Sequence, residues 1–118
     1  MTTRKPEVTP RLRVQSVASR HLKSKRQLPL NALRVFDVAA RHLNFKDAAA
    51  ELGVTNSAVS IQIKNIEEAL GAKLFGRHGH QMTLTPEGKR YFASIHAGLR
   101  IIADATSEFS KAVADHSN

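Results

Sequence analysis

The chain has 118 residues, 42% of them hydrophobic, which is enough for one domain with a modest core. It contains no cysteine, which excludes disulfide bonds and thiolate metal sites, and no apolar run approaches the roughly 18 residues that suggest a membrane-spanning helix. The formal net charge is +8, but residues 1–27 contain eight basic residues against Glu7 alone, so the nearly neutral remainder is not predicted to bind nucleic acid by its charge.

Residues 1–27 are predicted to form a flexible basic N-terminal arm, because Pro6 and Pro10 interrupt a stretch rich in Thr, Ser, Arg and Lys. Three interpretations of this arm stay open. It could be a tail without a role, including a mis-assigned translation start, or an arm that contacts DNA phosphates. Because it is rich in Arg and Ser and poor in acidic residues, it also fits an organelle transit peptide.

Two short helices are expected next. The second follows Asn44, a good N-cap residue, and ends at Gly53. The first begins after Pro29, and its apolar residues recur at steps of three and four in one stripe: Leu33, Phe36, Ala40 and Leu43. The inner face of the second helix consists of Ala48, Ala49 and Leu52.

A third helix is expected between the N-cap Thr55 and Gly71. Glu67 and Glu68 beside Lys64 are interpreted as part of its solvated face. The inner side has apolar residues at steps of four, three and four: Val59, Ile63, Ile66 and Leu70. The opposite side is centred on Ser57, Ile61, Lys64 and Glu68, flanked by Ser60 and Asn65.

A small β-hairpin and a long helix complete the pattern. The hairpin turns at His78-Gly79-His80, and the helix is capped by Thr85, spans 86–113 and leaves 114–118 as a tail. The helix carries a heptad seam: Phe92, Ile95, Leu99, Ile102, Thr106, Phe109 and Val113. At about 1.5 Å per residue it is longer than one three-helix core can cover, so a dimerisation helix is favoured over one that folds back on its own domain.

Two helices joined by a tight glycine-containing turn, the second polar at its start, are typical of a helix-turn-helix. The major groove accepts one helix, whose N-terminal residues meet the base edges. Asn56 suits paired hydrogen bonds to adenine, the hydroxyls of Ser57 and Ser60 suit bases or phosphates, and Lys64 suits a phosphate. The alternative is a helical hairpin inside some other bundle.

The stretch from Leu30 to Gly88, "LNALRVFDVAARHLNFKDAAAELGVTNSAVSIQIKNIEEALGAKLFGRHGHQMTLTPEG", resembles the N-terminal domain of LysR-type transcriptional regulators, and the likeness extends to about residue 113. It implies a mostly α-helical winged helix-turn-helix over 28–85, a linker helix over 86–113 that dimerises, and binding to interrupted inverted repeats near promoters. A tetramer is an open possibility. Carried over by position, the DNA contacts fall on Thr55, Asn56, Ser57, Ser60 and Lys64, with Arg77 at the wing.

Three features depart from the family pattern. Ile61 stands where the family usually has arginine, and could contact a thymine methyl or be merely exposed. The wing has His80, Gln81 and Thr83 at positions where basic residues are expected. The chain ends at Asn118, so the effector-binding domain of the family, and with it a small-molecule effector, is not expected in this chain.

Other functional classes fit less well. An enzyme is not expected, because the chain offers no cysteine nucleophile, glycine-rich phosphate loop or paired-carboxylate cleft, and no cofactor is predicted. His78 and His80 lack further ligands at metal spacing, so no metal site is expected. A competing hypothesis is a truncated protein that forms heterodimers with a full-length LysR-type regulator and interferes with it. The expected location is the bacterial cytoplasm, in association with the nucleoid.

Overall fold

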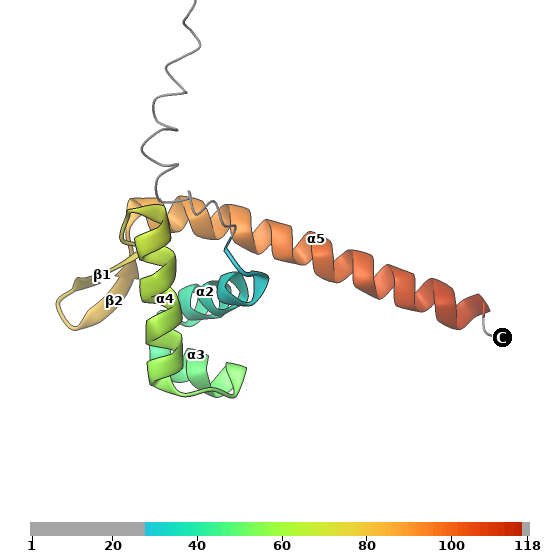
Figure 1. The fold of residues 1–118 in the computed structure, drawn as a ribbon, viewed down its shortest axis with the longest axis horizontal. Helices are drawn as coiled ribbons and strands as arrows, with labels where there is room; N and C mark the ends of the chain where they lie inside the picture. The colour runs from blue at the N-terminus through green and yellow to red at the C-terminus, as the bar shows by residue number, and fades with distance from the viewer. Residues whose placement is uncertain (1–27, 117–118) are drawn as a thin grey trace, which may run out of the picture.

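The computed structural model describes residues 28–116, so the predicted basic arm at 1–27 lies outside the described part. Three helices come first, then a two-stranded antiparallel hairpin, then one long helix (Figure 1). This confirms the mostly helical winged helix-turn-helix predicted from the sequence. The elements are α2 (Leu30–His42), α3 (Phe45–Leu52), α4 (Asn56–Leu70), β1 (Phe75–His78), β2 (Gln81–Leu84) and α5 (Pro86–His116).

Local capping sets the boundaries of α3 and α4, as the sequence predicts. The Asn44 side chain accepts a hydrogen bond from the Asp47 N–H, and the Thr55 hydroxyl oxygen accepts one from the Ala58 N–H, each over 3.0 Å. Both helices then end at a glycine in the left-handed region, with φ of 71° and 72°. The turn between α3 and α4 is therefore determined by the residues that flank it.

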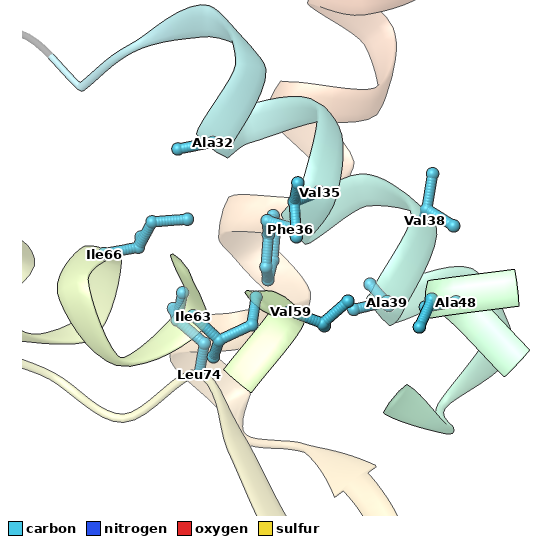
Figure 2. Packing of buried hydrophobic residues seen from close by; sticks show 12 residues of the cluster. Ala32, Val35, Phe36, Val38, Ala39, Ala48, Val59, Ile63, Ile66 and Leu74 are labelled. Carbon is cyan, nitrogen blue, oxygen red and sulfur yellow. The ribbon is translucent and has the colours of Figure 1, made fainter. Parts of the chain in front are cut away.

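The core is built around α2, which packs against α3, α4 and α5. Figure 2 shows Phe36 at its centre, fully buried. Its ring contacts those of Phe75, Tyr91 and Phe92, with centroids 5.4–6.4 Å apart. The single apolar stripe predicted for this helix was too narrow, because residues 35–40 are all buried where three helices surround α2. Leu43, which was predicted to belong to the stripe, is exposed at the end of the helix.

The start of α5 is fixed tightly to the segment between α4 and β1. The Thr85 hydroxyl oxygen accepts a hydrogen bond from the Gly88 N–H over 2.9 Å, and the same hydroxyl donates to the Lys73 carbonyl over 2.7 Å. A Cβ at Gly88 would lie 2.1 Å from the Leu74 carbonyl oxygen. Only glycine permits this approach of helix to backbone.

Beyond its first turns, α5 leaves the packed domain (Figure 1). Residues 101–116 are all exposed. The helix continues to His116, past the predicted end at 113, because nothing in 114–116 interrupts the backbone ladder and the His116 ring lies 3.2 Å from the Ala112 carbonyl oxygen. Across residues 28–116, none of the helices has the length and apolar character needed to cross a bilayer.

Candidate nucleic-acid interface

One side of α4 packs on the core and the other side faces solvent with the residues predicted to contact DNA. Val59, Ile63 and Ile66 are buried against α2 and α3, at 0–3% exposure. The predicted inner residue Leu70 is instead 40% exposed, because the last turn of α4 extends past the core. The predicted site residues on α4 and at its N-cap are all exposed, namely Thr55, Asn56, Ser57, Ser60 and Lys64.

Thr55 has two roles at the start of this surface. Its hydroxyl oxygen accepts the hydrogen bond that caps α4, which orients the side chain beside the exposed N–H groups of the first turn. The hydroxyl hydrogen can still be donated outward. The first turn of α4 therefore presents hydroxyl and amide donors together with a partial positive charge from the helix dipole, an arrangement that suits a phosphate.

A groove of about 430 Å³ separates α4 from the hairpin. Ser60 and Lys64 line it from the helix, and Arg77 and Met82 line it from the strands. The Arg77 guanidinium donates a hydrogen bond to the His80 carbonyl across the hairpin, over 3.3 Å, which holds its charge near the turn. The structure thus brings the predicted wing residue Arg77 to the same groove as Ser60 and Lys64.

Glu67 fixes the hairpin to α4, a role that the sequence interpretation missed. Its carboxylate accepts hydrogen bonds from the Leu74 and Phe75 N–H groups over 2.8 and 3.3 Å, and Lys73 Nζ lies 3.6 Å away. The prediction of a solvated face was wrong for Glu67, whose side chain is 12% exposed, because β1 begins directly over it. Its spacing of four from the buried Ile63 is the signal that could have identified it.

The predicted dimerisation seam on α5 divides into two parts. Phe92 and Ile95 pack partly buried against the core of their own domain, and Leu99 is also partly buried. Further along, Ile102 and Phe109 are 48% and 71% exposed. The Thr106 hydroxyl donates to the Ile102 carbonyl of its own helix over 3.0 Å. The part of the seam that remains open to a second chain therefore starts near Ile102.

One charged network, joined through Arg41, braces the surface around α2, and only its Asp37–Arg41 pair has a local signal in the sequence, the i,i+4 spacing. His96 Nδ1 lies 2.8 Å from Asp37 Oδ1, and Arg41 Nε lies 3.6 Å from Asp37 Oδ2. Arg41 and His42 also reach Glu51 on α3, each over 2.7 Å. Hydrogen bonds from His42 and Arg41 lower the pKa of the Glu51 carboxyl.

The described residues show no constellation suited to metal catalysis. Within 28–116, no group of three or more His, Cys, Asp or Glu side chains is placed to hold a metal ion. His78 and His80 lie at the exposed tip of the hairpin, where Gly79 turns the chain with a φ of 66°. The exposed surface of α4 and the hairpin offers hydrogen-bonding side chains, with positive charge from Lys64 and Arg77.

Comparisons with known proteins agree with this geometry. Residues 30–89 match the family model for "Bacterial regulatory helix-turn-helix protein, lysR family". The glycine cleavage system transcriptional activator of Escherichia coli K12 is 55% identical over 83 residues, which are 70% of this chain and 27% of that protein. The activator AmpR of Pseudomonas aeruginosa is 56% identical over 62 residues, which are 52% of this chain and 21% of that protein. The chain thus spans about a quarter of the length of these relatives.

Solved structures are similar over the same region. The BenM DNA-binding domain, in complex with catB site 1 DNA, matches with a TM-score of 0.66 and 29% identity, over 70% of this chain and 92% of that one. A probable transcriptional regulator from Pseudomonas aeruginosa matches with a TM-score of 0.64 and 35% identity, over 70% of this chain and 27% of that one. The fold is therefore that of a known regulator architecture.

Proposed function

The chain belongs to the LysR family of bacterial regulatory helix-turn-helix proteins, and from this premise we propose that it binds promoter DNA sequence-specifically, as a homodimer, and so regulates transcription. The observation that carries the proposal is the exposed polar face of α4, beside a hairpin that places Arg77 in one groove of the protein with Ser60 and Lys64. The major groove of B-DNA is wide enough to accept an α-helix. The proposed location is the cytoplasm, in association with the nucleoid.

The residues of this face fall into two groups, those suited to base edges and those suited to the phosphate backbone. Asn56, in the first turn of α4, offers the amide that pairs with adenine N6 and N7. Ser57 and Ser60 offer short hydroxyl groups to base edges or phosphates. Lys64 and Arg77, which line the groove between α4 and the hairpin, supply positive charge to the phosphate backbone of the DNA. Thr55 adds a hydroxyl donor where the helix dipole favours a phosphate.

A second copy of the chain is the proposed partner of the outer part of α5. Ile102 and Phe109 expose large apolar side chains at heptad spacing, and the helix projects well clear of its own domain (Figure 1). Pairing along this seam would present two copies of α4 to an inverted repeat. A heterodimer that interferes with a longer relative would use the same seam, and no observation favours it over direct DNA binding.

The test is selection of bound duplexes from a random pool with the full chain, followed by affinity measurements on the selected sequence. Asn56→Ala is expected to weaken binding and relax the preference at one base pair, with a loss of about 1–3 kcal/mol. Lys64→Ala should weaken binding to all DNA sequences alike and reduce the slope of log affinity against log salt concentration by about 0.9. Lys111→Ala, on the exposed outer part of α5, is the matched control. Failure to enrich any sequence over competitor DNA would overturn the proposal.

A further inference from the structure

Ile61 is the most exposed large hydrophobic residue among residues 28–84, at 58%. Its neighbours on α4, Val59 and Ile63, are buried at 0% and 3% exposure, so the core-facing side of the helix is elsewhere. Lone exposed apolar residues are ordinary on protein surfaces. What distinguishes Ile61 is its position in the middle of the face proposed to enter DNA.

Folding of α4 offers no reason for an isoleucine at this position. A β-branched side chain is a weaker helix former than lysine, arginine or glutamine, which are the usual residues on an exposed helix face. Its exposure also leaves most of the side chain in contact with water and contributes little to the core. The residue that occupies position 61 is therefore better explained by what the face contacts than by what the helix packs on.

The residues around Ile61 define the contact that it suits. Ser57 and Asn65 lie one turn away toward either end of the helix, and Ser60 and Lys64 lie along one side of Ile61; all four are exposed. The polar neighbours match base edges and phosphates, which leaves an apolar contact for Ile61 itself. Of the groups that the major groove presents, the 5-methyl of thymine is the apolar one.

We propose that Ile61 reads the 5-methyl group of a thymine and is a specificity-determining residue of this chain. The inference rests on the proposed DNA-binding function and deepens it. The restricted χ1 of isoleucine in a helix holds its methyl groups in place before binding, so the contact is made with little loss of side-chain freedom. The consequence is a preference for thymine over cytosine and uracil at one position of each half-site.

The experiment removes a single methyl group from the DNA. The full chain first selects its preferred duplex from a random pool, and each thymine of that duplex is then replaced in turn by deoxyuridine. At one position per half-site, the replacement is expected to weaken binding by the parent about fourfold for each half-site altered, the effect of one buried methyl-sized group. Binding by Ile61→Ala should not respond to the same replacement.

Two further variants serve as controls, with circular dichroism confirming that each is folded. Ile61→Val keeps a β-branched apolar side chain and should keep part of the response to the methyl group. Leu70→Ala removes an exposed apolar side chain from the far end of the same helix and should respond like the parent. Together they separate contact by Ile61 from a general effect of losing apolar surface.

The possible results separate the role of Ile61 from the proposed DNA binding by the chain. A parent that binds its selected duplex but ignores every deoxyuridine replacement overturns the role of Ile61 and leaves DNA binding intact. Equal responses of the parent and Ile61→Ala also overturn that role, because another residue then contacts the methyl group. Failure to select any duplex overturns the proposed function, and this inference with it.

Discussion

His96 on α5 and Asp37 on α2 meet through a contact of 2.8 Å between Nδ1 and Oδ1, across 59 positions of the chain. Asp37 is the one charged residue among the buried residues of the described chain, at 8% exposure, and Arg41 approaches its second oxygen. The His96 ring also packs on Phe92, with centroids 5.2 Å apart. This contact ties the long helix to the domain that carries α4, and so helps to set the angle between them.

Replacement of His96 tests that connection. His96→Ala should lower the free energy of unfolding by about 1–3 kcal/mol, because it leaves a buried carboxylate with one partner fewer. Thermal unfolding measures the loss. His116→Ala, which removes an exposed histidine from the end of the same helix, should change stability little. Equal effects of the two variants would contradict the proposed tie.

Two glycines of α5 should respond in opposite directions to alanine. Gly88→Ala places a Cβ 2.1 Å from the Leu74 carbonyl oxygen, so overpacking should cost roughly 1–3 kcal/mol of unfolding free energy. Gly98→Ala meets nothing within 4 Å and should stabilise the helix by about 0.5–1 kcal/mol. Denaturant unfolding of both variants measures the difference, and a neutral Gly88→Ala would refute the close approach.

Glu67 should matter to stability and to the position of the wing, whereas its neighbour should not. Glu67→Ala leaves the Leu74 and Phe75 N–H groups without their acceptor and should cost about 1–3 kcal/mol. Glu67→Gln retains an acceptor oxygen and should restore part of the loss. Glu68→Ala changes the exposed side of the same helix turn and is the control. If Glu67→Gln is as damaging as Glu67→Ala, the hydrogen bonds are not the cause.

Acid should remove the contribution of Glu51 to stability. Hydrogen bonds from His42 and Arg41 lower the pKa of Glu51 below its ordinary value of 4.5. A depressed folded-state pKa stabilises the protein above the unfolded value, and this contribution is lost as pH falls through the folded value. Thermal unfolding of the parent and Glu51→Gln should therefore differ at pH 7, and the difference should shrink as the pH falls below 4.5. A difference that does not shrink in acid would contradict this prediction.

The outer seam of α5 should decide the oligomeric state. Phe109→Asp places a charge at the most exposed large apolar residue of the described chain, at 71%, and should shift a dimer to monomer at micromolar concentration. Analytical ultracentrifugation measures the shift. Ser107→Asp adds the same charge on the side of the helix away from the seam and should leave the dimer intact. A dimer that tolerates Phe109→Asp would place the interface elsewhere.

The residues that carry the helix-turn-helix could be predicted because their roles are local. Asn44, Thr55, Gly53 and Gly71 act on backbone groups within a few positions, so the sequence by itself indicates where each helix begins and ends. The outer face of α4 follows from the 3.6-residue period in the same way. Its predicted polar residues are exposed except Glu67, which β1 covers, and Ile61 is exposed as well.

Only the tertiary structure decided which side chains are buried and which distant residues meet, because both depend on how the helices and strands cross. Periodicity treats Phe92 and Phe109 alike as seam positions, yet the first packs on its own core and the second is exposed. Glu67 has the pattern of a surface charge until β1 comes to lie over it. Caps and turns are settled by neighbours in the chain, whereas burial and long-range pairing depend on packing angles that no local pattern encodes.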